Sequence, residues 1–252
     1  MNITCPTEDQ IPGLRRLWMA AFGDTDEFLD AFFRTAYDAE RCRCVMKDDE
    51  PAAALYWFDC SLEGAKLAYI YAVATDPAHR GKGLCRMLME DTMDTLTKNG
   101  YHGALLVPQE PWLIEMYKKM GFTPATTVSE FHVMAAGAPI PVRRVGPTGF
   151  SRRRRELLPP GGVIQERENA LFLKSQMSLY IGENWLAATA EVDGMLWCCE
   201  FLGDPTLAPG FVKALGYREG SFRVPGSGRP FSMFRPLTVD CPSPLYFGLA
   251  FD

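Results

Sequence analysis

The stretch VATDPAHRGKGLCRML, residues 73–88, combines a strand end, a glycine-rich turn and the first turns of a helix. An apolar run precedes it, and apolar residues at helical spacing follow it from Cys85 to Leu96. Gly81 and Gly83 allow a close approach of the main chain to a ligand, and the free N–H groups at a helix start attract anions. The stretch therefore predicts an anion site, to which three basic residues add positive charge: Arg80, Lys82 and Arg86.

The common nucleotide-binding patterns do not fit this turn. The chain has no G-x4-G-K-[ST], and G-x-G-x-x-G would need a third glycine where Arg86 stands. Ordinary solvation of a helix start is the alternative explanation for the basic residues. We expect a rarer phosphate-binding turn.

The segments around the turn predict a regular order of elements. A capping box of Thr7 and Gln10 opens a helix that ends at Gly23, and a second helix covers 26–37. Three β-rich runs bounded by turns then predict an antiparallel meander over 41–47, 52–60 and 66–75. After the helix that follows the turn, we expect a strand over 103–108, a helix over 111–120 and a strand over 122–134.

These residues resemble the acyl-CoA pyrophosphate loop of the GNAT-type N-acetyltransferase superfamily, whose pattern is [QR]-x-x-G-x-[GA] preceded by V-x-V-x-P. Arg80 and Gly83 fit, whereas Cys85 stands where the family has Gly or Ala and Thr75 where it has Val. A second block, LLVPQEPWLIEMYKKMGF (105–122), is similar to the family's last strand and helix, with a tyrosine four residues before the Gly-Phe pair. That tyrosine is Tyr117, and the resemblance covers roughly residues 3–135.

The resemblance implies an α/β fold, a mixed central sheet with two splayed strands flanked by helices. The pantetheine arm of acetyl-CoA would lie between these strands and pair with main-chain groups of Val73, Ala74 and Thr75. The pyrophosphate would bind the loop and helix start: Arg80, Gly81, Lys82, Gly83, Leu84, Cys85 and Arg86. Acetyl-CoA is the expected cosubstrate, and no metal is expected.

The family match also implies catalytic residues. Tyr117 would protonate the departing CoA thiolate, although it could instead pack on Leu113 or Ile114. The resemblance does not assign a base. Glu130, Glu110 and the C-terminal carboxylate of Asp252 are candidates, and aromatic residues of the first two helices are candidates for the acceptor pocket: Trp18, Phe22, Phe28 and Phe32.

The second half of the chain predicts a smaller domain. Proline and glycine are frequent over 137–148, which we interpret as a linker between domains at 1–136 and 149–252. FVKALGY, 211–217, repeats the pattern of MYKKMGF, 116–122, and NWLAATAEV and MLWCCEFL predict a hairpin at Asp193-Gly194. We expect a degenerate GNAT-like half without a glycine-rich turn. The arrangement is similar to the enhanced-intracellular-survival branch of aminoglycoside-type acetyltransferases, whose third, sterol-carrier-like domain we do not expect in 252 residues.

Composition limits the partners. The net charge is −5, with 20 acidic and 13 basic residues in 1–140, which disfavours nucleic acid and favours an amine-bearing acceptor. Without a signal peptide or a long apolar run we expect a cytoplasmic protein without membrane contact, a monomer or a homodimer. Arg152 to Arg155 predict a solvated helix face that starts at Ser151 as N-cap, or alternatively a phosphate or nucleic-acid contact.

The sequence thus predicts an acetyl-CoA-dependent N-acetyltransferase that acts on a small or peptidic amine. One alternative is a non-catalytic acyl-CoA-binding regulatory module. Another is a tandem transferase that uses aminoacyl-tRNA, which the acidic first half disfavours.

Overall fold

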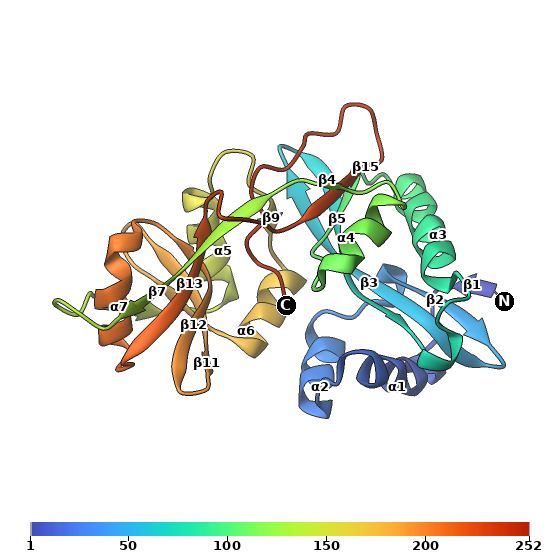
Figure 1. Cartoon of the computed structure of the whole chain (residues 1–252), viewed down its shortest axis with the longest axis horizontal. Helices are drawn as coiled ribbons and strands as arrows, with labels where there is room; N and C mark the ends of the chain where they lie inside the picture. The colour runs from blue at the N-terminus through green and yellow to red at the C-terminus, as the bar shows by residue number, and fades with distance from the viewer. Residues whose placement is uncertain (1, 252) are drawn as a thin grey trace. The chain divides into compact units, whose positions relative to one another are not determined.

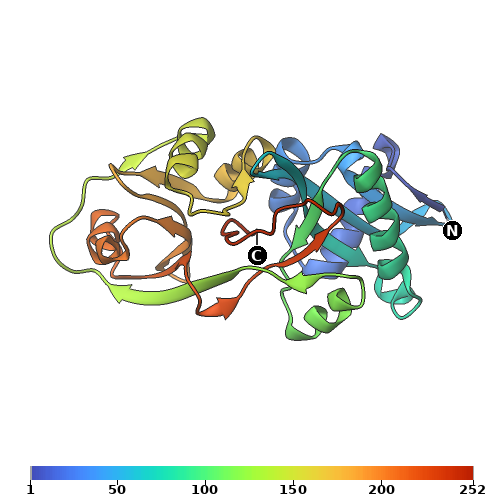
Figure 2. The same cartoon turned by 90° about the horizontal axis from the view of Figure 1, so that it is seen from above.

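A computed structural model describes residues 2–251 of the chain (Figures 1 and 2). Its contacts divide the chain into two compact units. Unit 1 holds residues 2–60, 64–123 and 234–242, and unit 2 holds residues 61–63, 124–233 and 243–251. Each unit contains its own sheet and helices.

Unit 1 is a mixed sheet with helices on both faces. The sheet order is β1-β2-β3-β4-β5-β15-β6. Its strands are β1 (Asn2–Thr4), β2 (Cys42–Lys47), β3 (Glu50–Leu62), β4 (Ala65–Thr75), β5 (Gly103–Leu106), β15 (Met233–Pro236) and β6 (Thr123–Pro124). The helices are α1 (Ile11–Phe22), α2 (Asp26–Thr35), α3 (Leu84–Lys98) and α4 (Pro111–Lys118), with 3-10 turns η1 (Glu8–Gln10), η2 (Ala39–Arg41) and η3 (Pro77–His79). Figure 1 shows α1 and α2 on one side of the sheet and α3 and α4 on the other.

The mixed α/β fold is confirmed in unit 1, and so is the predicted order of elements as far as α4. The single strand predicted over 122–134 is wrong, because the structure divides it into β6 and a second strand, Thr127–Met134, which belongs to unit 2. Gln10 accepts a hydrogen bond from the Thr7 N–H at 3.1 Å, and Gly23 ends α1 with φ 75°. β2 and β3 pair antiparallel, whereas β4 and β5 pair in parallel around the crossover helix α3. The short strand β1 was not predicted, because three residues carry no periodic signal.

Unit 2 is a second sheet with the order β14-β7-β13-β12-β11-β10-β8. Its strands are β7 (Thr127–Met134), β8 (Arg143–Arg144), β10 (Ser178–Ile181), β11 (Leu186–Val192), β12 (Met195–Leu202), β13 (Glu219–Pro225) and β14 (Arg229–Pro230); β9 (Ile164–Gln165) also belongs to the unit. The helices are α5 (Pro147–Leu157), α6 (Glu168–Gln176) and α7 (Ala208–Ala214), with a 3-10 turn η4 (Pro205–Leu207). Helix α7 packs on an aromatic core around Phe201, Phe211 and Phe222.

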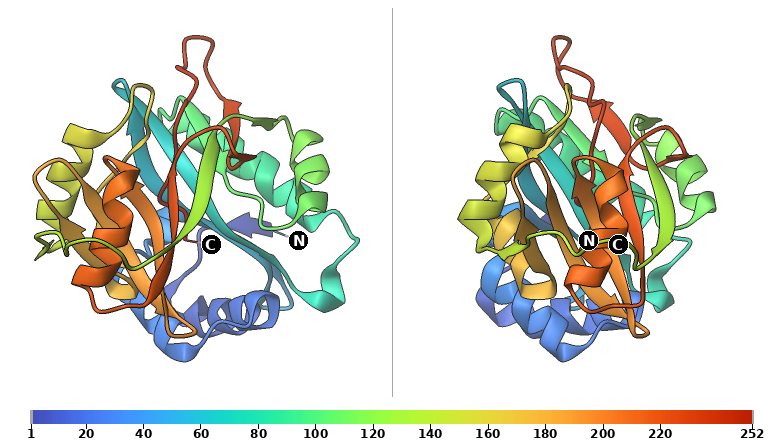
Figure 3. Two further views of the ribbon diagram at one scale, coloured as in Figure 1. Left: turned by 60° about the vertical axis from the view of Figure 1, so that its left-hand side comes forward. Right: turned by 90° about the vertical axis from the view of Figure 1, so that its left-hand side faces the viewer.

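Each sheet contains a strand from the other half of the sequence. β7 follows the α4 segment in the chain but pairs with β13 in unit 2. In return, β15 follows β14 in the chain but lies beside β5 in unit 1 (Figure 3). The two halves of the sequence have therefore exchanged strands.

Two local predictions in unit 2 have different outcomes. The hairpin is confirmed, because Asp193 and Gly194 take φ 51° and 77° between β11 and β12. The N-cap prediction for Ser151 is wrong: α5 begins at Pro147 after the N-cap Gly146. Proline at the first helical position starts the helix one turn earlier than Ser151, because its missing N–H needs no partner there. Within the range predicted as a linker, β8 pairs with β10.

Within residues 2–251, no helix combines the length and the apolar character needed to cross a membrane.

Candidate functional site

The glycine-rich turn joins β4 to α3 in unit 1. Asp76 begins the turn, since its carboxylate accepts a hydrogen bond from the Ala78 N–H at 2.8 Å and stabilises η3. Gly81 and Gly83 follow with φ 74° and 78°, a backbone conformation that other residues adopt only with strain. The turn is exposed, and it ends at Gly83, the N-cap of α3.

The helix start directs free N–H groups outward. The first helical hydrogen bond is donated by the Met87 N–H to the Gly83 carbonyl at 3.1 Å, so the N–H groups of Leu84, Cys85 and Arg86 have no acceptor within the helix. Gly83 provides no side-chain cap, and the first turn of α3 has no acidic residue. These N–H groups and the positive end of the helix dipole form a surface suited to a phosphate.

The basic side chains of the turn are held locally. Arg80 Nε donates to the Thr75 carbonyl at 3.3 Å, and Lys82 Nζ donates to the Ala78 carbonyl at 2.9 Å. Both side chains are exposed. Among residues 2–251, neither side chain forms an ion pair with a carboxylate, so both charges stay beside the turn.

β4 and β5 separate before the turn. Their register runs from Leu67 opposite Gly103 to Tyr69 opposite Leu105, whereas β4 continues to Thr75. Ala72 lies in the part of β4 that does not pair with β5. Its φ of 48° bends the strand. Val73, Ala74 and Thr75 follow this bend, so their edge facing β5 is not part of the parallel ladder. The separation provides the splayed strands that the family resemblance implies.

Tyr117 lies near the end of α4 and is 6% exposed. Its ring meets Phe122 edge-on, with centroids 6.0 Å apart. Burial raises the pKa of Tyr117 well above its usual value, and the neighbouring Cys85 adds to this shift. Tyr117 therefore keeps its proton at neutral pH. Within residues 2–251, its hydroxyl has no hydrogen-bond partner.

Cys85 is a neutral thiol. Burial raises its pKa to about 11, so almost no thiolate is present at neutral pH. The loop pattern of the GNAT superfamily has Gly or Ala at this position, and the side chain of Cys85 is also small. The chemistry of the thiol is not needed for phosphate binding.

The three candidate bases have different environments. Glu130, on β7 in unit 2, is bound by Arg229 at 2.6 Å and by Arg223 at 3.1 Å. The hydrogen bond from Arg229 and then that from Arg223 lower the pKa of Glu130, which makes this carboxylate a weaker base. Glu110 is exposed at the N-cap of α4. Asp252 lies outside the described residues.

The aromatic residues of α1 and α2 divide into core and surface. Trp18 and Phe32 are 2% and 1% exposed, and their centroids lie 4.7 Å apart, so both are core residues. Phe22 is 37% exposed and Phe28 is half-buried. Of these four candidates, Phe22 and Phe28 are the two with exposed ring surface.

The arginine run is not a solvated face throughout, so this prediction is wrong for Arg154. Arg154 is 2% exposed and makes a bidentate ion pair with Glu200. Arg153 pairs with Glu156 and Arg155 with Glu166. The sequence analysis missed this buried pair, although the signal is present: Glu200 is a charged residue inside the apolar run of β12.

The described residues, 2–251, contain no cluster of His, Cys, Asp or Glu side chains arranged to hold a metal ion.

In comparisons with known proteins, the chain matches one family model and many solved structures. Residues 2–125 match the family model of the acetyltransferase (GNAT) domain. A GCN5-related N-acetyltransferase from Kribbella flavida is 19% identical with a TM-score of 0.73, over 94% of this chain and 72% of that chain. Eis1 from Mycobacterium abscessus is 11% identical with a TM-score of 0.67, over 95% of this chain and 75% of that chain.

A tandem GNAT protein from the clavulanic acid biosynthesis pathway is 9% identical with a TM-score of 0.59, over 95% of this chain and 99% of that chain. At these identities the likeness concerns the fold. A search of curated protein sequences gives no match.

Proposed function

Because the chain belongs to the GNAT acetyltransferase superfamily, we propose that it transfers an acetyl group from acetyl-CoA to a primary amine of a small or peptidic acceptor. The observation that carries this proposal is the corner of unit 1. There, the splayed end of β4, two glycines with positive φ and the uncapped start of α3 follow one another in the chain. This order supplies main-chain partners for an extended arm and then N–H groups for a pyrophosphate.

The residues of this corner offer partners for two parts of acetyl-CoA, the pantetheine arm and the pyrophosphate. The edge of Val73, Ala74 and Thr75 can pair with the amides of the pantetheine arm, as a neighbouring strand would. The loop and helix start, residues 80–86, offer N–H groups and uncancelled positive charge to the two phosphates. Bulky side chains at 81 or 83 would interfere with that approach.

The reaction forms a C–N bond and breaks a C–S bond. A neutral amine attacks the thioester carbonyl carbon, and the CoA thiolate leaves. An alkylamine has a pKa of about 10.4, so its deprotonation at pH 7 costs roughly 4.6 kcal/mol. The amine must therefore lose a proton to a base, while the thiolate gains one from an acid.

Tyr117 is suited to be the acid. Its raised pKa keeps the phenol protonated before reaction, and the thiolate takes the phenolic proton as the C–S bond breaks. Solvent then returns a proton to the phenolate. The neutral state of Cys85 supports direct attack by the amine over an acetyl-cysteine intermediate.

For the base, we propose the Asp252 carboxylate. Glu130 is bound by two arginines, and Glu110 is exposed to solvent. Asp252 is the remaining candidate. It would take the proton of the attacking amine and release it to solvent.

The test is CoA thiol release from acetyl-CoA in the presence of a panel of primary amines, with mass spectrometry of the amine. We expect release that depends on the amine, and a product heavier by one acetyl group. Binding of acetyl-CoA without release for any amine would instead indicate a regulatory acyl-CoA-binding module. Release without amine acetylation would indicate a thioesterase.

A further inference from the structure

An open pocket lies at the edge of the unit 2 sheet where β8 is the last strand. Its volume is about 290 Å³, near the lower end of the range for small-molecule pockets. The side chains around it include two arginines, Arg143 and Arg153, and one carboxylate, Glu183. All residues around the pocket belong to unit 2.

The pairing of β8 with β10 brings Arg143 to this pocket. Arg143 lies opposite Ile181, and Arg144 lies opposite Tyr180. Successive residues of a strand point to opposite faces of the sheet, and Tyr180 packs on the aromatic core beneath α7. Arg143 and Ile181 therefore lie on the other face, where they line the pocket together with Arg153 of α5.

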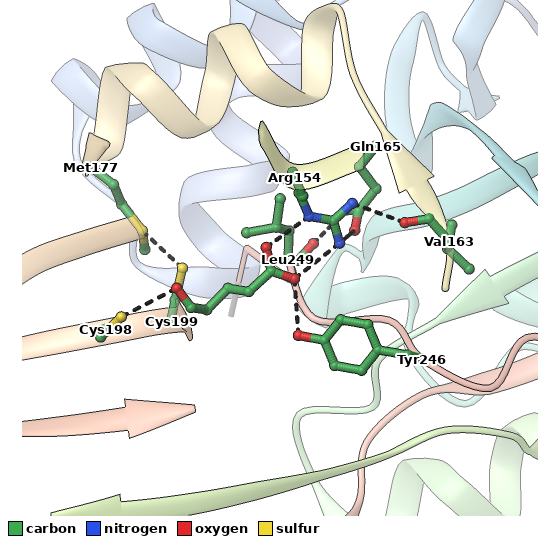
Figure 4. Close-up of polar contacts among 9 residues, drawn as sticks. Arg154, Val163, Gln165, Met177, Cys198, Cys199, Tyr246 and Leu249 are labelled. Carbon is green, nitrogen blue, oxygen red and sulfur yellow. Dashed lines mark hydrogen bonds and ion pairs between the residues drawn. The ribbon is translucent and has the colours of Figure 1, made fainter. Parts of the chain in front are cut away.

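Arg154, the next residue of α5, shows how a buried arginine of the same run is bound. Its Nε and Nη2 donate to the Glu200 carboxylate at 2.7 and 2.9 Å, and its Nη1 donates to the Val163 carbonyl at 2.9 Å (Figure 4). Gln165 also accepts a hydrogen bond from Arg154, and Tyr246 donates to Glu200. These partners bind the Arg154 guanidinium in the core, away from any ligand.

Arg143 and Arg153 are bound less completely. Arg153 donates to Glu156 Oε2 at 2.8 Å, and its side chain is 26% exposed. Among residues 2–251, the exposed Arg143 side chain has no hydrogen-bond or ion-pair partner. A guanidinium with free N–H groups binds a carboxylate through two parallel hydrogen bonds. Two such groups, from two different elements, line one pocket.

The charge of the lining favours a monoanion. Arg143 and Arg153 contribute two positive charges and Glu183 one negative charge, so the three together carry +1. One carboxylate balances this charge, whereas a dianionic phosphate leaves an excess of negative charge beside Glu183. An apolar body behind the carboxylate also has a partner. Part of the wall is apolar: Pro141, Val142 and Ile181.

We propose that this pocket, which we call the β8 site, binds a small monocarboxylate with an apolar body. The carboxylate lies between Arg143 and Arg153, and the body packs on the apolar wall. The proposal concerns binding alone, and it stands whether or not the chain transfers acetyl groups.

The probe is para-fluorobenzoate, and its binding to the full chain is measured by ligand-observed fluorine NMR. Arg143→Gln and Arg153→Gln each remove one guanidinium and keep a polar side chain, so each should weaken binding about tenfold. Arg152→Gln is the matched control, since Arg152 is exposed on the same helix and is not among the residues around the pocket. Its affinity should equal that of the wild type.

Three further measurements test the assigned ligand class. Glu183→Gln removes the negative charge, so the affinity should rise about threefold, a gain that a misfolded variant would not give. The alcohol para-fluorobenzyl alcohol has the same ring without the charge, and it should bind about tenfold more weakly. Inorganic phosphate at the concentration of the probe should not displace it.

Equal affinities of wild type and Arg143→Gln would place the probe elsewhere on the chain and overturn the β8 site. Equal binding of the alcohol, or displacement of the probe by equal phosphate, would overturn the assigned ligand class. Absence of NMR-detected binding for para-fluorobenzoate, para-fluorophenylacetate and hexanoate alike would overturn the proposal as a whole.

Discussion

Asp76 in unit 1 and Asp204 in unit 2 make the same turn after corresponding strands. Each carboxylate accepts a hydrogen bond from the N–H two residues later, at 2.8 Å in unit 1 and 2.9 Å in unit 2. A proline and a three-residue 3-10 helix follow both residues. The strands before the turns also correspond, since Leu67 pairs with Gly103 and Leu196 with Gly220, both in parallel.

The two turns continue differently. In unit 1, exposed residues 80–83 separate η3 from α3, and two of them are glycines with positive φ. In unit 2, η4 ends at Leu207 and α7 begins at Ala208 without a loop. Helix α7 therefore takes the place of α3 in the topology, but the phosphate-binding loop has no counterpart.

From this difference we predict one acetyl-CoA site per chain. Isothermal titration calorimetry should give a stoichiometry near one, because in the described part of the chain, residues 2–251, only unit 1 offers an uncapped helix start behind a glycine turn. A stoichiometry of two would mean that α7 binds the second ligand without such a loop, and would contradict the prediction.

Gly83→Asp should abolish tight binding of acetyl-CoA. A carboxylate beside the free N–H groups of α3 would occupy the anion site and repel a pyrophosphate, so the affinity should fall on the order of 10- to 100-fold or more. Gly64→Asp is the matched control, since Gly64 has φ 87° and open space around it. Both variants introduce similar backbone strain. An equal loss of affinity in both would point to a folding defect, and no loss in Gly83→Asp would exclude the site.

The corner was predictable because its signals are local. Glycines with positive φ, a proline turn and apolar residues at a 3.6-residue period lie within a few residues of one another. The strand exchange was not predictable, since the sequence of β7 predicts a strand but does not identify the strand with which it pairs. Its pairing with β13 depends on contacts between residues that are far apart in the sequence.

The residues proposed for the site stay a prediction, whereas their surroundings can be compared with the structure. The family pattern identifies residues 80–86 and Tyr117, but no local pattern shows that Ala72 takes φ 48°, because alanine is not a residue typical of that conformation. The environment of Glu130 depends on Arg223 and Arg229, which lie 93 and 99 residues away in the chain. Long-range pairing of this kind leaves no periodic trace in a single sequence.

Tyr117→Phe should slow transfer without weakening acetyl-CoA binding. The substitution removes only the phenolic oxygen, so kcat should fall roughly 10²-fold if proton donation to the thiolate limits the reaction. Tyr56→Phe is the control, because the buried Tyr56 hydroxyl has no hydrogen-bond partner among residues 2–251. Its removal should leave kcat unchanged and raise the stability by about 1 kcal/mol. Equal kcat values in the two variants would mean that water protonates the thiolate.

Glu130→Gln should lower stability in a pH-dependent way. Arg229 and Arg223 hold the pKa of Glu130 below its unfolded value of about 4.3, so the unfolded chain binds more protons between the two pKa values. The carboxylate therefore contributes stability above pH about 4.3, and this contribution is lost as the pH falls through the folded pKa. The Tm difference between wild type and variant should be largest near pH 7 and vanish in acid.

The control for this prediction is Glu156→Gln, which removes a carboxylate from the Arg153 pair at the surface of α5. It should change Tm little at any pH. A Glu130→Gln variant with wild-type Tm but a much lower kcat would contradict our interpretation and make Glu130 the base.

Removing one partner of the Arg154–Glu200 pair should cost more than removing both. Arg154→Met leaves the Glu200 carboxylate buried without its cation, which typically costs about 3–5 kcal/mol. Arg154→Met combined with Glu200→Leu removes both charges, so urea denaturation should show that more than half of that loss is recovered. Arg155→Met, which breaks an exposed pair with Glu166, should leave the urea midpoint unchanged.

The double variant should still show faster hydrogen exchange in residues 245–251, because Tyr246 and Gln165 lose their partners even when the global stability returns. A double variant as unstable as Arg154→Met would show that the charges stabilise unit 2 themselves. Recovered stability together with faster hydrogen exchange in residues 245–251 would show that the main role of the pair is to hold these residues in place.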